Sequence, residues 1–215
     1  MKVTNRTLER ASGFSLSQIR RWAVLCLGRD PEADKSGGRR REYDIDEAFL
    51  IFLTGTLITH YRFGQNEVKT HLNNLKPLLE SDNLLPSKIR YKGLDYKDWD
   101  FMPNQLIMRA ESYLKLKNRA MAPLRPGIDI IILPDNNYLL ESYLRLFFFD
   151  EKLSMTDAVT FSITKRFPDE NNIAKPGPYY RIPLYDLIVD FNQLIEWHSL
   201  HDKAIIKNGA LDQNN

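Results

Sequence analysis

Two short helices that meet at a glycine are the feature that most constrains the start of this 215-residue chain. Thr4 can cap a first helix, because its hydroxyl can accept a hydrogen bond from an N–H of the first turn, and Gly13 can end that helix in a left-handed conformation. Ser15 can then cap a second helix. Two short helices joined by so tight a turn predict a helix-turn-helix arrangement.

The second helix is amphipathic. Its apolar residues recur at helical spacing and predict a buried side made of Leu16, Ile19, Ala23 and Leu25. The residues left to face outward are Ser17, Gln18, Arg20 and Arg21. Trp22 allows two interpretations, a core side chain or a nucleic-acid contact. We favour the core, because a buried indole contributes a large apolar area to a small domain.

Positive charge is concentrated near the N-terminus. The whole chain has a net charge of +2, whereas residues 1–43 contain ten Lys and Arg against five Asp and Glu, a net charge of +5. A local positive field attracts polyanions and speeds their encounter. A solubilising surface would have the same composition, so charge alone leaves both interpretations open.

A loop, a basic strand and two further helices complete the expected first domain, residues 1–80. Residues 28–38 have no apolar period, and Arg39-Arg40-Arg41-Glu42-Tyr43 follows as a basic strand of a hairpin. Asp44 or Asp46 can cap a third helix that is apolar around most of its circumference. Pro77 and residues 81–86 mark the end of a fourth helix that follows Gly64, and residues 81–87 should be a linker.

Residues 88–207 should form a second domain of mixed helices and strands, so the predicted fold class is α+β with helix predominating. Asn104 opens an amphipathic helix, and residues 128–133 have the length and composition of a buried strand. Residues 138–149 place apolar side chains at helical spacing and predict a helix, with a hairpin turning at Asn136-Asn137 as the alternative.

The end of the chain predicts two helices and a strand. Ser154 with Asp157 resembles a capping box and predicts a helix that ends near Phe167. Residues 179–182 predict a strand, and Pro183 suits the first turn of a last helix. We expect the tail, residues 208–215, to be disordered.

The N-terminal third of the chain resembles the DNA-binding domain of the MerR-type winged helix-turn-helix regulators. Residues 4–8, Ala11-Ser12-Gly13, Phe14-Ser15 and Ile19-Arg20-Arg21-Trp22 follow the family's order of cap, first helix, glycine turn and recognition helix. Arg41-Glu42-Tyr43 matches the wing motif of arginine, any residue and aromatic, while residues 46–57 and 64–72 match the third and fourth helices.

The resemblance implies a double-stranded DNA-binding transcriptional regulator. Its second helix would enter the major groove, and the wing arginines would hold the phosphate backbone and so position the domain. Arg20 and Arg21 offer forked donors suited to phosphate or guanine edges. The residues assigned to DNA contact are Ser15, Ser17, Gln18, Arg20, Arg21, Arg39, Arg40, Arg41 and Tyr43.

Three features depart from the family pattern. The loop 28–38 has another form, Arg21 stands where an aromatic is more frequent, and no long heptad helix follows Leu75. A monomer and a homodimer therefore remain alternatives, and a palindromic operator follows only from the dimer. Excisionase-like proteins of phages and mobile elements share the small fold and bend DNA for recombination, which is the alternative function.

No motif predicts catalysis, so we expect no enzyme, no metal and no cofactor. Cys26 is the only cysteine of the sequence, which excludes an internal disulfide framework. Its side chain is either a small buried hydrophobe or a nucleophile or redox sensor. The competing enzyme hypothesis requires the aspartates of the second domain to converge in one cleft: Asp129, Asp135, Asp186 and Asp190.

The second domain leaves several partners open. It would sense a small-molecule or protein effector, or form an oligomer. A protein-interaction adaptor, the third hypothesis, predicts an exposed apolar patch on this domain. No window approaches the apolar length of a membrane span and the first residues are polar, so we expect a cytoplasmic protein without a membrane partner.

Overall fold

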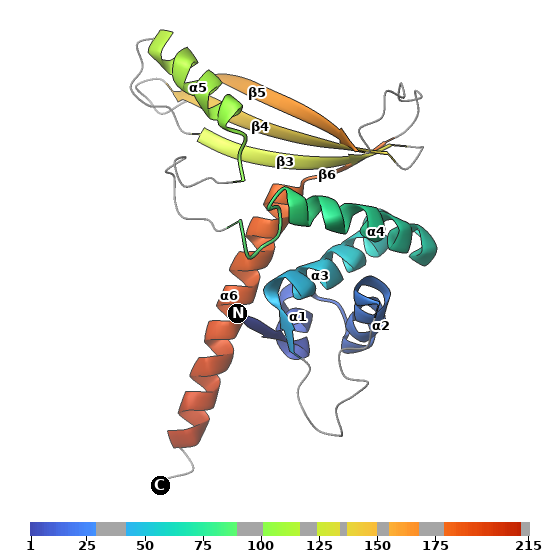
Figure 1. Cartoon of the computed structure of the whole chain (residues 1–215). Coiled ribbons are helices and arrows are strands. Elements are labelled where there is room, and N and C mark those ends of the chain that lie inside the picture. The colour runs from blue at the N-terminus through green and yellow to red at the C-terminus, as the bar shows by residue number, and fades with distance from the viewer. Residues whose placement is uncertain are drawn as a thin grey trace. The chain divides into compact units, whose positions relative to one another are not determined.

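The computed structural model describes residues 1–28, 42–89, 101–116, 124–133, 137–149, 155–167 and 179–211 (Figure 1). Over these residues the fold is a mixed α+β fold in which helix predominates, as the sequence predicts. The chain divides into two compact units. We call residues 1–88 with 188–215 the N-terminal unit, and residues 89–187 the central unit.

The N-terminal unit is built from helices around a two-stranded sheet. Its elements are β1 (Lys2–Thr4), α1 (Asn5–Ser12), α2 (Leu16–Leu27), β2 (Glu42–Asp44), α3 (Ile45–Thr59), α4 (Gln65–Ser81) and, from Ile188 onward, α6 (Leu184–Leu211). β1 and β2 pair antiparallel, with Val3 opposite Tyr43. The predicted loop 28–38 lies outside the described residues beyond Gly28.

The predicted start and end signals of the first helices are confirmed. The hydroxyl of Thr4 accepts a hydrogen bond from the backbone N–H of Thr7 at 3.1 Å and so caps α1. Gly13 ends α1 with φ 72°, a left-handed conformation that costs glycine little. Of the two candidate caps for α3, Asp44 is the one used, since it accepts from the N–H of Glu47 at 2.8 Å.

A close approach between α2 and α3 fixes the core of the N-terminal unit. The Phe14 and Trp22 rings lie edge to face with centroids 4.8 Å apart. Both rings fill the space beside Gly55 on α3, where an added Cβ would lie only 2.5 Å from each of them. Glycine is therefore required at this position by the packing of the two rings.

Replacing this glycine should weaken the packing of α2 against α3. We expect Gly55→Ala to lower the free energy of unfolding by about 1–3 kcal/mol, because the new methyl group overpacks the contact with Phe14 and Trp22. Thr70→Ala, on the exposed face of α4, should change it by no more than about 0.5 kcal/mol. Denaturant unfolding of both variants measures the difference, and equal effects would contradict the close contact.

The end of α4 matches one of its two predicted signals. The helix continues through Pro77 and ends at Ser81, so of the predicted end signals the segment from Ser81 is the one used and Pro77 is not. The following residues are not a free linker. Leu84 is buried, and the N–H and hydroxyl of Ser87 donate to the carboxylate of Asp46 at 2.8 and 2.6 Å. These contacts hold the end of the segment 81–87 against the first turn of α3.

His71 gives the N-terminal unit a pH dependence. Its side chain is only 3% exposed, its ring centroid lies 4.8 Å from that of Phe63, and burial lowers its pKa below 6.5 despite the opposing effect of Glu67. The folded chain thus binds this proton less readily than the unfolded chain. The stability that neutral, buried His71 contributes to the folded chain is fully present above the pKa that His71 has in the unfolded chain. It is lost as the pH falls toward the lower pKa of His71 in the folded chain.

We therefore expect the free energy of unfolding to fall as the pH is lowered from about 7.5 to 5.5, and to fall less steeply in His71→Gln. Thermal unfolding across this pH range measures the two slopes. Since the comparison is between slopes, a constant loss of stability in the variant does not affect it. Parallel slopes would mean that His71 does not titrate differently in the folded chain.

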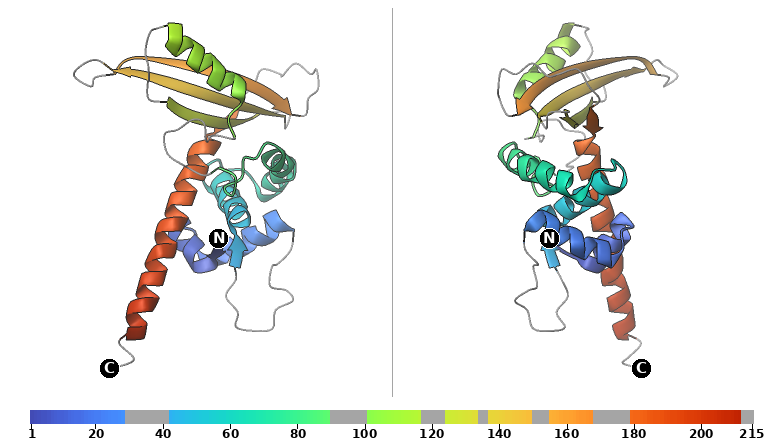
Figure 2. Two further views of the ribbon diagram at one scale, coloured as in Figure 1. Left: turned by 60° about the vertical axis from the view of Figure 1, so that its left-hand side comes forward. Right: turned by 90° about the vertical axis from the view of Figure 1, so that its right-hand side faces the viewer.

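The central unit is an antiparallel sheet with one helix across it. Its strands lie in the order β5-β4-β3-β6, and neighbouring strands are antiparallel. The elements are α5 (Asn104–Leu116), β3 (Leu124–Ile132), β4 (Tyr138–Phe149), β5 (Met155–Phe167) and β6 (Tyr180–Ile182). Both views of Figure 2 show α5 over one face of the sheet, where Tyr113 of α5 contacts Phe161 of β5.

Two helix predictions in this unit are wrong. Residues 138–149 form β4, so the hairpin that was the alternative is correct, and residues 155–167 form β5. In β4, burial alternates between even and odd positions, with Leu140 and Leu144 buried and Arg145 exposed. β5 is rich in Thr, Val and Ile, which pack well on a pleated surface and outweigh the capping-box pattern. The helix from Asn104, the strand at 128–133 and the strand at 179–182 are confirmed.

α6 departs from the predicted domain boundaries. Its start after Pro183 is confirmed, but the helix continues to Leu211, so the predicted disorder from residue 208 is wrong as far as Leu211. From Ile188 the helix belongs to the N-terminal unit, where Phe191 contacts Phe49 and Phe52 of α3 at centroid distances of 5.5 and 5.3 Å. These aromatic contacts, rather than sequence order, decide to which unit the helix belongs. Among the described residues, no helix is long and apolar enough to span a membrane.

Candidate nucleic-acid interface

The start of α2 is fixed by two of the residues assigned to DNA contact. Gln18 donates its backbone N–H to the hydroxyl of Ser15 at 3.4 Å, and its side-chain oxygen accepts the N–H of Ser15 at 2.9 Å. This is a reciprocal capping box. The Ser15 hydroxyl and the Gln18 carbonyl oxygen therefore hold the helix start, while the Gln18 amide NH₂ is the group that can donate to a base or phosphate.

A carboxylate from α1 also lies at this helix start. The backbone N–H of Leu16 donates to Oε1 of Glu9 at 3.2 Å. This bond ties α1 to α2 and places a negative charge where the helix dipole favours one. A phosphate approaching this end of α2 would compete with Glu9, so the cationic contacts must lie farther along the helix. The sequence does not predict this bond, because Glu9 and Leu16 are seven residues apart and match no capping pattern.

The outward face of α2 is polar and cationic. Ser17, Arg20 and Arg21 are exposed, whereas Ile19 and Trp22 are buried. Within the part of the chain that the structure describes, neither guanidinium has a carboxylate partner. Both forks are therefore able to bind phosphate or the acceptor edge of guanine. Residues 1–28 contain five Lys and Arg against the single Glu9, and Lys2 and Arg6 are also exposed.

The structure describes only part of the basic strand. Arg39, Arg40 and Arg41 lie outside the described residues. Tyr43 is in β2, where its side chain is 0% exposed and faces the core, since alternate residues of a strand point to opposite sides. The assignment of Tyr43 to DNA contact is therefore corrected to a core role. Its partner strand β1 decides which side of β2 is buried, and sequence alone did not specify that pairing.

Trp22 and Cys26 have packing roles on the inward-facing side of α2. Trp22 is buried, which confirms the predicted core role. Burial raises the pKa of the Cys26 thiol to about 11, although a hydrogen bond with Thr54 opposes the shift. A thiol with this pKa is protonated at neutral pH and is a poor nucleophile. Cys26 is half-buried, and the raised pKa favours a packing role over a nucleophile or redox sensor.

A second polar cluster lies on one face of the central sheet. Arg181 of β6 pairs with Asp129 of β3 at 3.3 Å and with Glu141 of β4 at 2.5 Å, and Arg125 pairs with Asp186 at 3.2 Å. Asp129 is only 4% exposed. Burial raises the pKa of Asp129, an effect that the nearby Arg181 partly offsets.

These pairs bear on the enzyme hypothesis. Asp129 and Asp186 lie near enough for the charge of Asp186 to contribute to the raised pKa of Asp129. Asp135 lies outside the described residues, and Asp190 is exposed on the part of α6 that belongs to the N-terminal unit. The two aspartates that approach each other are each held by an arginine. These pairs explain the cluster as a set of structural contacts that join β3, β4, β6 and the first turn of α6.

Comparisons with models of known protein families, with curated proteins and with solved structures found no match for this chain. A function must therefore be argued from its own residues. The outward face of α2 has two adjacent exposed guanidinium groups, without carboxylate partners among the described residues, beside short polar side chains on one rigid element. We therefore take this face as the candidate site.

Proposed function

We propose that this chain is a double-stranded DNA-binding transcriptional regulator, and that its N-terminal unit contains a winged helix-turn-helix domain of the MerR type. The observation that supports the proposal is the position of Arg20 and Arg21. They lie exposed beside Ser17 on the outward face of α2, and that helix follows α1 through the Gly13 turn. In the proposal, α2 enters the major groove.

The chemistry of this face suits duplex DNA. An α-helix fits the major groove of B-DNA, and an arginine fork can make two parallel hydrogen bonds to the O6 and N7 atoms of guanine. Ser17 and the amide NH₂ of Gln18 lie near the N-terminal end of α2, the end that reaches the bases in helix-turn-helix complexes. In the proposal, Arg39, Arg40 and Arg41 bind phosphates and position the domain.

Binding to duplex DNA across a salt series tests this proposal. We expect the affinity of the parent chain for a random-sequence duplex to fall steeply with salt. A variant with Arg20→Ala and Arg21→Ala should bind at least about tenfold more weakly at low salt. The slope of its log affinity against log salt concentration should also be shallower, by an amount that corresponds to at most about two lost phosphate contacts. A matched control, Arg145→Ala with Lys165→Ala, removes the same charge from the central unit.

Each outcome has a distinct meaning. Equal losses in both double variants would mean that only net charge matters and that α2 is not the contact element. No binding by the parent at low salt would overturn the DNA-binding proposal and favour the protein-interaction adaptor. Fluorescence transfer between the two duplex ends separates the excisionase-like alternative, because an architectural protein would bring the ends together by bending the DNA.

We also infer that the regulator acts as a homodimer through α6. Over residues 188–200, where the side chains of α6 are described in the N-terminal unit, the buried residues are Ile188, Phe191 and Ile195. The exposed large apolar side chains of the same stretch are Leu194, Trp197 and Leu200. Trp197 is 59% exposed, and such a side chain on a long helix is typical of a surface that a partner covers. A second copy would present the same apolar surface in return.

Sedimentation measurements test the homodimer. We expect the parent chain to sediment as a dimer at micromolar concentration and Trp197→Glu to sediment as a monomer, because the new carboxylate would be buried without a partner. Gln193→Glu is the matched control, since it adds the same charge at an exposed position of α6. A monomeric parent, or a dimer that Trp197→Glu leaves intact, would contradict the assignment.

A further inference from the structure

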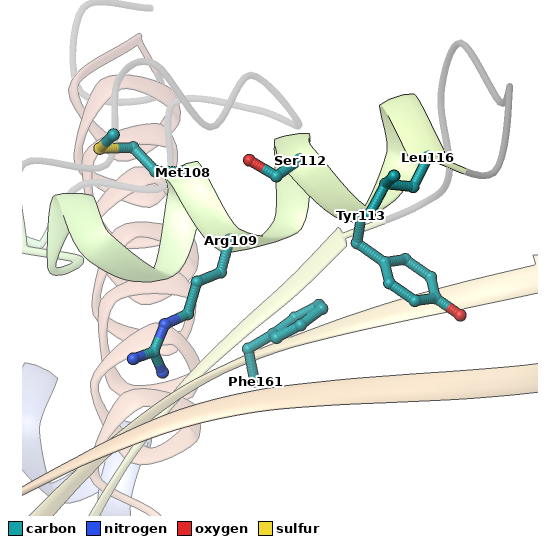
Figure 3. Close-up of a pocket in the computed structure, with 6 residues that line it drawn as sticks. All are labelled: Met108, Arg109, Ser112, Tyr113, Leu116 and Phe161. Atoms are coloured by element: carbon teal, nitrogen blue, oxygen red, sulfur yellow. The ribbon is translucent and has the colours of Figure 1, made fainter.

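A shallow cavity of about 350 Å³, largely open to solvent, lies between α5 and the edge strand β5 of the central unit. Its lining residues are Met108, Arg109, Ser112, Tyr113, Leu116 and Phe161 (Figure 3). The volume lies within the range of about 300–1,000 Å³ that is typical of small-molecule sites. Most of the lining is apolar or aromatic, which suits a ligand with an apolar body.

Two aromatic rings form one wall of this cavity. Tyr113 from α5 and Phe161 from β5 have ring centroids 5.7 Å apart at an interplanar angle of 67°. Leu116 is 83% exposed at the end of α5, and Met108 is also exposed. A flat apolar group placed here would contact both rings and cover side chains that otherwise face solvent.

Arg109 supplies a positive charge beside these rings. Figure 3 shows Arg109 and Tyr113 extending from α5 toward the sheet on either side of the Phe161 ring. Among the described residues, no carboxylate pairs with Arg109. Ser112 lines the same cavity one helical turn farther along α5, so its hydroxyl can add a hydrogen bond. A guanidinium fork is the protein group best matched to a carboxylate.

We propose that this cavity binds a small carboxylate with an aromatic body. The guanidinium of Arg109 pairs with the carboxylate, and Phe161 and Tyr113 contact the aromatic ring. The assignment rests on residues of the central unit alone, so it is independent of DNA binding by the N-terminal unit. No sequence pattern predicts the cavity, because its residues come from elements about fifty positions apart.

Calorimetric titration of the full chain with two probes tests the assignment. The probes are 2-naphthoate and 2-naphthylmethanol, which share the ring system and differ in charge. We expect the acid to bind at least about tenfold more tightly than the alcohol, since an ionic pair with arginine adds to the ring contacts. Arg109→Gln should remove this difference by weakening the acid alone. Phe161→Leu should weaken both probes.

The matched control is Arg145→Gln. Arg145 pairs in register with Thr160, next to Phe161, so it lies on the opposite face of the sheet from the cavity. This variant should bind both probes like the parent. Because Arg109 is exposed, Arg109→Gln should unfold at the parent temperature, which separates lost binding from lost folding. Failure of the acid to bind, equal binding of both probes, or unchanged binding by Arg109→Gln would overturn the proposal.

Discussion

The contact of Phe14 and Trp22 with Gly55 determines how the N-terminal unit presents its surface. Because Gly55 has no side chain, the two rings come close to the backbone of α3. That approach buries the side of α2 that contains Ile19 and Trp22. Successive helical residues turn by about 100°, so Ser17, Arg20 and Arg21 then lie on the outward face. The candidate site is thus a consequence of one packing contact in the core.

The two ends of the chain depend on the same helix. α3 packs against α2 through Gly55 and against α6 through Phe49 and Phe52. Its cap residue Asp44 also ends β2, so the strand that buries Tyr43 leads directly into the central helix. In the central unit, by contrast, arginine pairs tie three strands on one face, while α5 covers the other and leaves a cavity at the edge. The cationic site and the cavity therefore belong to separately packed units.

The sequence predicted what local interactions decide and missed what pairing between distant segments decides. Caps at Thr4 and Ser15 and the Gly13 turn involve neighbours in sequence, so their patterns were sufficient. β4 was mistaken for a helix because its Leu and Phe residues fit both spacings, and only the pairing with β3 and β5 selects the strand. The burial of Tyr43, the bond of Glu9 to α2 and the contacts of Phe191 with α3 likewise depend on distant partners.

The most direct test of the account follows backbone amide NMR signals of the full chain as duplex DNA is added at low salt. If DNA binds through α2, the largest shift changes lie between Ser15 and Val24, and β3, β4 and β5 show none. Changes of that pattern would place the DNA on the outward face that the Gly55 contact exposes. Changes concentrated in the central unit, or an α2 that stays unperturbed while DNA binds, would contradict it.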